Sequence, residues 1–205
     1  ALIRSGDTIL THCNTGALAT VGVGTALGAV FRAKELGKKI SVYATETRPL
    51  LQGARLTSWE LQKKRIPATL VCDTVVGDLF RRKKVKKVFV GADRIAQNGD
   101  TANKIGTYTI ASLAKMHRIP FYVVAPLSTF DFSIAGGRSI PIEERKGEEV
   151  SAPFGVRIAP RKTRIYNPAF DVTPAHLISA FVTDGGIVHP PYSKTLRKLR
   201  RRKCS

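Results

Sequence analysis

The chain has 205 residues, of which 43% are hydrophobic and 24% are charged, and its formal net charge at pH 7 is +19. This length suits one sizeable core, and the composition is that of a globular domain, which excludes a disordered or fibrous chain. No run approaches the roughly 18 uninterrupted apolar residues of a membrane span, and the three cysteines lack the spacing of a disulfide framework or a structural zinc site.

Short apolar runs alternate along the chain with longer segments of helical character. The expected strands, in chain order, lie at 7–13, 38–46, 68–73, 86–93, 120–126 and 185–189. The expected helices lie in the stretch that ends at Leu36 and at 53–65, 75–82, 102–118 and 173–181. Residues 131–165 lack a clear period, and we expect an excursion with short hairpin-like pieces. The pattern predicts an α/β fold, a Rossmann-like open, mostly parallel sheet of about six or seven strands flanked by helices.

Much of the positive charge lies in two stretches of the sequence. Seven Lys and Arg residues fall between Lys194 and Lys203, and six more fall between Arg81 and Lys87. We interpret both as solvated surface, and a weak anion-binding or nuclear-targeting role of the tail is the alternative. No aromatic residues interleave with these cations to stack on bases, so we expect no nucleic-acid partner.

Ligands of open parallel sheets bind outside the carboxyl ends of the strands, so the residues that end each apolar run are candidates. These residues are Cys13, Glu46, Asp73, Asp93 and Pro126. The first four are ionisable and should face one edge of the sheet. We expect Cys13 just before a helix, where the helix dipole would lower the pKa of the thiol; a small residue in a tight turn is the alternative. Asp73 is better explained as a helix cap, and the role of Glu46 stays open.

The other cysteines and the histidine beside Cys13 are weaker candidates. Strand alternation points His12 away from Cys13, so a Cys–His catalytic pair is not favoured. Cys72 lies at the end of an apolar run and should be a buried strand residue, and Cys204 lies in the basic tail.

Two further polar groups stand near these strand ends. Asn103 and Lys104 follow Asp93 and are expected to open a helix, where N–H groups and a lysine would cradle a phosphate. The alternative is a capping asparagine beside a solvated lysine. The segment ETRPLLQGAR (46–55) brings two arginines and Gln52 to a strand-to-helix corner that suits a sugar or a phosphate.

Three glycines, Gly22, Gly24 and Gly28, superficially resemble a dinucleotide-binding fingerprint. Their spacing is GxGxxxG, and they begin well after the strand has ended instead of in the turn itself. A helix face packed closely on the sheet explains them better, so we expect no nicotinamide cofactor.

Six motifs together resemble one family, that of methylthioribose-1-phosphate isomerase. They are THCNTGALAT (11–20), ETRPLLQGARLT (46–57), GADRIAQNGDTANKIGTY (91–108), PFYVVAPLSTFD (120–131), IPIEER (140–145) and NPAFDVTP (167–174). They occur in the family's order from about residue 3 to about residue 190. The same superfamily includes ribose-1,5-bisphosphate isomerase and the alpha, beta and delta regulatory subunits of the translation-initiation guanine-nucleotide exchange factor.

The resemblance implies an aldose–ketose isomerase of methionine salvage, which converts 5-methylthioribose 1-phosphate to 5-methylthioribulose 1-phosphate without a cofactor or a metal. It implies that Cys13 is the catalytic base and Asp93 the catalytic acid, and that Gln52, Asn103 and Lys104 bind the phosphorylated sugar substrate. The alternatives are a ribose-1,5-bisphosphate isomerase and a non-catalytic regulatory subunit. The intact Cys13/Asp93 pair favours an isomerase.

The resemblance also bears on domains, partners and location. We expect a Rossmann-like catalytic domain at 1–190 and a basic tail at 191–205, in a homodimer with no membrane partner. The family has an N-terminal domain with a basic, glycine-containing phosphate-binding segment, so we expect a missing N-terminal domain or a second chain, and no activity without it. Gly22-Val23-Gly24 departs from the family's frequent GYG. A cytoplasmic location is expected, and the tail leaves a nuclear one open.

Overall fold

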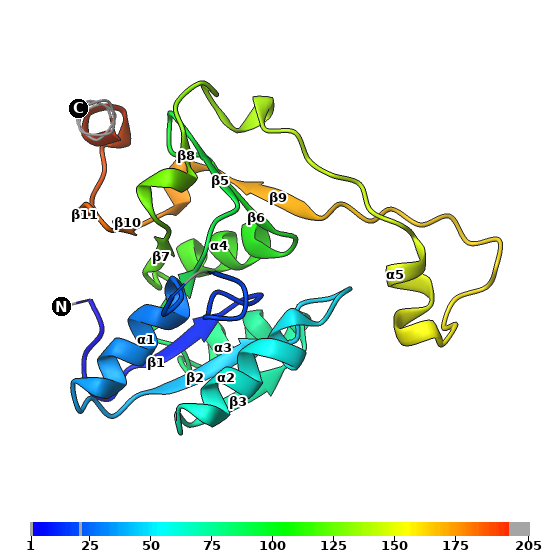
Figure 1. The fold of residues 1–205 in the computed structure, drawn as a ribbon, viewed down its shortest axis with the longest axis horizontal. Helices are drawn as coiled ribbons and strands as arrows, with labels where there is room; N and C mark the ends of the chain where they lie inside the picture. The colour runs from blue at the N-terminus through cyan, green and yellow to red at the C-terminus, as the bar shows by residue number, and fades with distance from the viewer. Residues whose placement is uncertain (1, 21, 197–205) are drawn as a thin grey trace.

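The computed structural model describes residues 2–20 and 22–196, and its centre is a sheet of seven strands in the order β11-β10-β7-β4-β1-β2-β3 (Figure 1). These strands are β1 (Thr8–Thr11), β2 (Ser41–Thr45), β3 (Ala68–Val71), β4 (Lys87–Val90), β7 (Phe121–Val124), β10 (Ala180–Thr183) and β11 (Gly186–Val188). All neighbours pair in parallel except β10 and β11, which form an antiparallel hairpin at one end. The expected open, mostly parallel sheet is confirmed.

Helices cover both faces of this sheet because successive strand residues point to opposite sides. Helices α1 (Ala26–Glu35) and α2 (Ser58–Lys63) pack on the side that Ile9 faces, and a π-helical turn (Gly53–Thr57) leads into α2. Helices α3 (Val76–Arg81) and α4 (Thr107–Met116) pack on the side that Leu10 faces. The result is two apolar layers, one on each face.

A second, smaller sheet leaves the carboxyl edge of the first. Its order is β8 (Phe130–Asp131), β5 (Arg94–Ala96), β6 (Thr101–Lys104) and β9 (Phe170–Thr173). The chain enters it directly from β4, through three residues that end in Asp93. The small sheet therefore stands beside the edge at which a parallel sheet binds ligands.

Between β8 and β9 the chain makes a long excursion, which we call the arm (residues 132–169). Its first part packs on the small sheet through Ile140, and Figure 1 shows the rest extending away from both sheets. It contains the short helix α5 (Glu148–Ser151) and one isolated bridge between Glu144 and Pro168. Arg48 Nη2 donates to Val150 O at 3.0 Å and so ties the arm to the segment after β2. The expected excursion is present, but the hairpin-like pieces are not, because the arm pairs with itself only at that bridge among the described residues.

Several expected elements are corrected. The helix expected at 102–118 begins only at Thr107, because residues 101–104 form β6 with partners on both sides. The segment 173–181, expected as a helix, instead ends β9 and starts β10. The first helix begins at Ala26, so Gly22 and Gly24 are not on a helix face but in the turn before it, with φ of +88° and +90°.

The expected buried strand at 68–73 is also corrected. β3 is the edge strand of the sheet and is mostly exposed, so Cys72, which follows it, is exposed too.

No helix in the described part of the chain is long and apolar enough to cross a membrane. Within residues 2–20 and 22–196, no group of three or more His, Cys, Asp or Glu side chains could hold a metal ion. Residues 197–205, most of the expected tail with Cys204, lie outside the described residues.

Candidate active site

A cavity of about 850 Å³ opens at the carboxyl ends of the parallel strands. Cys13, Asp93 and Pro126, which follow β1, β4 and β7, line it, as expected for residues that end these strands. It is also lined by Gln52, from the turn before α2, and by Asn103 and Lys104, from β6. All five candidate site residues of the sequence thus meet in one cavity. Glu46 and Asp73 are not among the lining residues.

Cys13 is held by hydroxyl groups on both sides of its backbone. Its N–H donates to Thr47 Oγ1 at 2.9 Å, and its carbonyl accepts from Thr57 Oγ1 at 2.6 Å. The backbone of Cys13 is left-handed, with φ of +64°, a conformation that costs a non-glycine residue free energy and persists only when its surroundings impose it. The two threonines supply that constraint, and sequence reasoning missed both.

His12 is buried and belongs to the scaffold under Cys13. Its Nε2 donates to Ile105 O at 2.8 Å, so Nδ1 must accept the hydrogen bond from Thr45 Oγ1 at 2.6 Å. Burial lowers the pKa of His12, which keeps the ring neutral. Because both ring nitrogens are engaged elsewhere, His12 does not act on the Cys13 thiol, in line with the expectation that it points away.

A buried carboxylate, Glu60, shapes the loop that follows Cys13. It accepts hydrogen bonds from Asn14 Nδ2 and Ala17 N, each at 2.9 Å, and more weakly from Leu18 N. A Cβ at Gly16 would collide with this carboxylate, so the loop needs glycine there. Sequence reasoning missed Glu60; the available signal was its position on the same helical face as Thr57.

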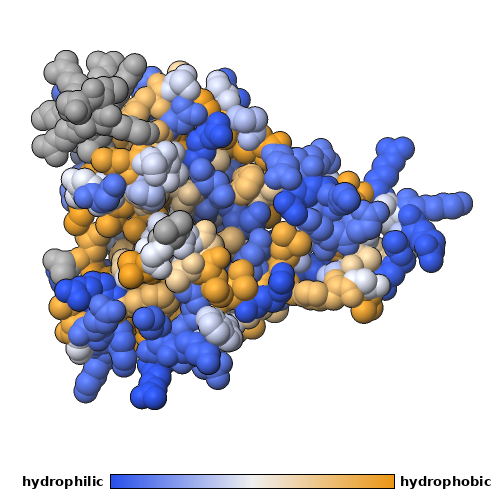
Figure 2. Space-filling view, viewed as in Figure 1, coloured by the Kyte–Doolittle hydropathy of each residue, from blue (hydrophilic) through white to orange (hydrophobic). Residues whose placement is uncertain are grey.

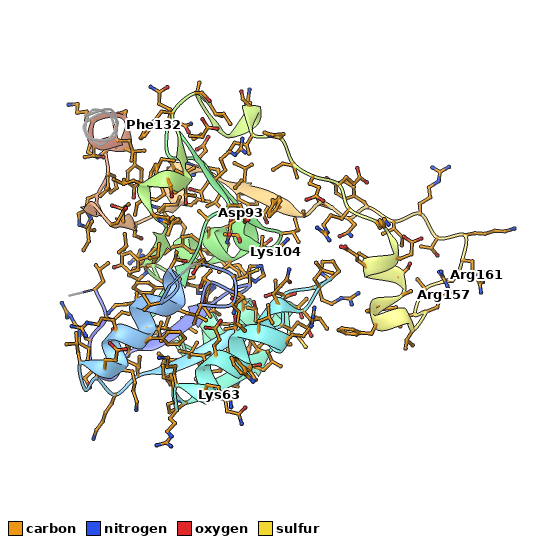
Figure 3. All side chains as sticks on the ribbon, viewed as in Figure 1. Lys63, Asp93, Lys104, Phe132, Arg157 and Arg161 are labelled. Atoms are coloured by element: carbon orange, nitrogen blue, oxygen red, sulfur yellow. The ribbon has the colours of Figure 1, made fainter. Side chains whose placement is uncertain are left out.

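Lys104 brings a positive charge into the cavity and forms no salt bridge with any residue that the structure describes. Its Nζ donates to Ala169 O at 2.9 Å and lies 4.5 Å from the centre of the Phe170 ring. Among the described residues that line the cavity, it is the one Lys or Arg. Figure 3 shows Lys104 beside Asp93, where the chain passes from the large sheet into the small one. A buried, unpaired ammonium group of this kind is suited to an anionic ligand.

Burial dominates the pKa of both candidate catalytic groups. It raises the pKa of the Cys13 thiol, while Lys104 and the Asn14 N–H oppose the change and the charge of Asp93 adds to it. Desolvation also raises the pKa of Asp93, against the lowering effect of Lys104. Asp93 lines the cavity but is exposed as a residue, so its desolvation is partial. Lys104 thus lowers the pKa of both Cys13 and Asp93, against the effect of burial.

The expected lowering of the Cys13 pKa is therefore wrong. The expectation assumed a helix directly after Cys13, whose dipole would stabilise a thiolate. The next helix, α1, begins only at Ala26, and the intervening residues form turns. What remains at Cys13 is a partly buried sulfur, and desolvation disfavours its charged form.

The phosphate cradle expected at a helix N-terminus is not formed by Asn103 and Lys104. Both lie in β6, and Asn103 Nδ2 donates to Thr107 Oγ1 at 3.0 Å. The N-terminus of α4 is occupied by Asp171, whose carboxylate accepts from Gly106 N at 2.7 Å and Tyr108 N at 3.0 Å. Any phosphate contact by Lys104 therefore depends on the lysine itself and not on a helix dipole.

Gln52 and Asp73 differ in what they offer a ligand. Gln52 Oε1 is buried and accepts no hydrogen bond from the described part of the chain, which leaves an acceptor for a donor such as a sugar hydroxyl. Asp73 accepts from Thr47 N at 2.8 Å and Arg48 N at 2.7 Å. It therefore holds the turn after β2, a structural role, although it does not cap its own short helix as expected.

A model of the Initiation factor 2 subunit family matches residues 1–190. The chain belongs to this family. It is 59% identical over 198 residues to methylthioribose-1-phosphate isomerase from Syntrophus aciditrophicus and 60% identical over 197 residues to the protein of that name from Pelotomaculum thermopropionicum. These alignments cover 97% and 96% of the chain but 54% of each relative, so the chain spans about half the length of the curated relatives it matches.

Two solved structures of the Initiation factor 2 subunit fold are close in shape. The structure of translation initiation factor eIF-2B, subunit delta, from A. fulgidus has a TM-score of 0.94 and 48% identity, and the alignment covers 98% of this chain and 58% of that one. The structure of 5-methylthioribose 1-phosphate isomerase from Pyrococcus horikoshii OT3 has a TM-score of 0.93 and 47% identity, over 98% of this chain and 56% of that one. The resemblance read from the sequence motifs is confirmed at the level of the family.

Proposed function

We propose that this chain carries the catalytic cavity of a methylthioribose-1-phosphate isomerase, an aldose–ketose isomerase that needs no cofactor. The observation that carries the proposal is the meeting of Cys13, Asp93 and Lys104 in one cavity at the carboxyl edge of the sheet. The names of the relatives at 59% and 60% identity support the same activity. The protein would act in methionine salvage, in the cytoplasm, as a homodimer.

The substrate's chemistry matches the lining of the cavity. Lys104 supplies a positive charge for one phosphate group, and the unpartnered Gln52 Oε1 supplies an acceptor for a sugar hydroxyl. The other wall is apolar, formed by Ala29, Leu56 and Val182 among others, and can cover a methylthio group. A ribose 1,5-bisphosphate would place a second dianion in a cavity whose described lining has one cation, so the monophosphate is favoured.

The reaction needs two proton transfers, and the pair supplies one donor and one acceptor. A carboxylic acid at Asp93 donates to the ring oxygen as the bond from C1 to that oxygen breaks, which leaves the positive charge on C1 and its phosphate oxygen. The Cys13 thiolate then removes the hydrogen from C2, and the electron pair forms the C1=C2 enol phosphate. The Cys13 thiol then returns a proton to C1 while the 2-hydroxyl group loses its proton to water, which gives the ketone, and Asp93 regains a proton from solvent for the next turnover.

The active pair holds a single proton, with Asp93 protonated and Cys13 ionised. Because the ordinary pKa of a thiol lies far above that of a carboxyl group, this arrangement is a minor form of the singly protonated pair. Burial at Cys13 makes the thiolate rarer and also more basic, which suits the removal of a carbon-bound hydrogen.

Exchange of the ketose product with deuterated water tests these roles on the full-length protein. The product is open-chain, so removal of its C1 hydrogen requires the base but not the acid that opens the ring. We expect Cys13→Ser to lose both isomerisation and C1 exchange, and Asp93→Asn to lose isomerisation while it retains exchange. Exchange in Cys13→Ser at the wild-type rate would refute the proposed base, and loss of exchange in Asp93→Asn would refute the assignment of Asp93 to ring opening alone.

The similar structure named as an eIF-2B delta subunit keeps a second class open, a non-catalytic regulatory subunit. Such a protein acts through protein contacts and needs neither a thiol nor a carboxyl group in a cavity. The retained Cys13 and Asp93 therefore favour the isomerase. A full-length protein that converts neither sugar phosphate would favour the regulatory class instead.

A further inference from the structure

The amino edge of the large sheet, opposite the cavity, carries a concentration of positive charge that the proposed isomerase does not use. We call the five segments that lead into β1, β2, β3, β4 and β7 the basic edge (residues 3–7, 36–40, 64–67, 82–87 and 117–120). They hold eleven Lys and Arg residues: Arg4, Lys38, Lys39, Lys64, Arg65, Arg82, Lys83, Lys84, Lys86, Lys87 and Arg118. They hold one carboxylate, Asp7.

These segments are scattered in the sequence and gathered by the fold. The five strands are consecutive neighbours in the order β7-β4-β1-β2-β3, and all pair in parallel, so their leading segments lie on one edge. Neighbouring strands are about 4.8 Å apart, so the row is about 20 Å long. Figure 2 shows hydrophilic side chains along the lower rim of the molecule, around α1 and α2, and Figure 3 places Lys63, beside the third segment, on that rim.

Part of this charge has a structural use, and part has none. Lys38 Nζ donates to Ile3 O at 2.6 Å and Lys86 Nζ donates to Gly6 O at 2.9 Å, while Lys87 pairs with Asp7. By contrast, Lys39 and Lys84 are exposed and make no ion pair with any residue in the described part of the chain. An ordinary solvated surface mixes both signs, because like charges gathered on one edge repel one another.

We propose that the basic edge binds the phosphate backbone of a nucleic-acid duplex without reading its base sequence. Duplex nucleic acid carries about one charge per 1.7 Å of axis, so a row of about 20 Å faces several phosphates. The five segments contain no Phe, Tyr or Trp, so they offer no platform for the stacked bases of a single strand. This departs from the expectation of no nucleic-acid partner, which considered the cationic stretches one at a time.

A protein partner fits this edge less well. Protein interfaces bury an apolar core and deplete lysine, whereas Lys and Arg make up eleven of the 24 residues in these five segments. A negatively charged lipid surface shares the anionic chemistry, so vesicles serve as a competing outcome of the test.

The test measures anisotropy of a labelled mixed-sequence duplex of about 20 base pairs with the 205-residue chain. If about four phosphates are contacted, affinity should fall by about 100-fold between 50 and 200 mM salt. The double variant Lys39→Glu/Lys84→Glu should lose at least about tenfold at 50 mM salt. The matched control is Arg157→Glu/Arg161→Glu on the arm, which changes the net charge by the same amount. These two arginines form no ion pair with any residue that the structure describes, and Figure 3 shows them at the far end of the molecule. It should lose less than about threefold.

The proposal would be overturned if the chain did not bind the duplex at 50 mM salt, or if the edge and arm variants lost equal affinity for it. It would also be overturned if deletion of residues 197–205, with the basic edge intact, abolished duplex binding. Binding to phosphatidylserine vesicles but not to the duplex would likewise overturn it. Circular dichroism of each variant separates a charge effect from unfolding, and a misfolded double variant would be replaced by Lys39→Gln/Lys84→Gln.

Discussion

At the scale of single residues, burial has the largest effect on the pKa of the Cys13 thiol, and two neighbouring charges of opposite sign adjust it. Burial raises the pKa of the thiol, Lys104 lowers it and Asp93 raises it further. The thiol is therefore a reporter of both charges, and its titration can be followed without any turnover.

We expect the apparent pKa of Cys13 to rise in Lys104→Met and to fall in Asp93→Asn, because the first change removes a stabilising positive charge and the second a destabilising negative one. The measurement is the rate of iodoacetamide alkylation against pH. It is made in a Cys72→Ser/Cys204→Ser background, since Cys72 is exposed and would react as well. Shifts of the Cys13 pKa in the opposite directions, or no shift in either variant, would contradict the expected effects of the Lys104 and Asp93 charges on the thiol.

The sequence motifs sufficed for the five candidate site residues that meet in the cavity, but not for the residues that hold them in place. Cys13 and Asp93 end apolar runs, and a run's end can be read from the sequence. Thr57 and Glu60 meet the Cys13 loop only because α2 packs beside β1 and β2, at a sequence separation of more than 40 residues. Such contacts are products of tertiary packing, and no local pattern encodes them.

At the scale of elements, a partly buried carboxyl group in β9, that of Asp171, caps the start of helix α4. Asp171 in β9 accepts two N–H groups at the start of α4, where the left-handed Gly106 precedes the helix. Burial raises the pKa of Asp171 to about 6, even though these backbone hydrogen bonds lower it. Removal of the proton from Asp171 therefore costs more in the folded than in the unfolded chain.

The sign of the pH effect follows from that difference. Between about pH 4 and pH 6 the folded chain binds this proton and the unfolded chain does not, so the contribution of Asp171 to stability falls as pH rises through about 6. We expect the free energy of unfolding of the wild type, relative to Asp171→Asn, to drop by about 1–3 kcal/mol from pH 4 to pH 7.5. Urea titrations of the two proteins at both pH values measure this drop, and a constant difference would refute the raised pKa.

The same region shows why the sequence predicted the large sheet well and the small one poorly. Strands such as β4 are wholly apolar at their centre and are recognised by composition alone. The segment Thr101–Lys104, by contrast, is polar in sequence yet fully buried, because β5 and β9 pair with it on both sides. Polar residues become a buried strand only when the partners are already in place, and β9 lies more than 60 residues further along the chain.

At the scale of the whole molecule, the cavity and the basic edge lie at opposite ends of the same strands. The carboxyl ends carry Cys13 and Asp93, while the amino ends carry the cations of the turns that precede each strand. This separation means that the two proposed activities can be tested independently, with variants of one edge that leave the other edge unchanged.

The described lining of the cavity contains little positive charge for a phosphate ligand. A phosphate monoester is usually held by several donors, yet Lys104 is the one cation in the described lining. The chain also spans about half the length of its curated relatives. We therefore expect the 205-residue chain alone to give no measurable turnover of 5-methylthioribose 1-phosphate, and the full-length protein to turn it over at an ordinary enzymatic rate of about 1–1000 per second.

The comparison is made by following ketose formation with both proteins at equal concentration, with full-length Cys13→Ser as the inactive control. Residual binding of inorganic phosphate by the short chain, measured by calorimetry and lost in Lys104→Met, would show that the cavity is folded and that its phosphate site is only partly built. Turnover of the short chain at the full-length rate would instead mean that Lys104, Asn103 and Gln52 suffice, and that the remaining half of the relatives contributes nothing essential to the chemistry.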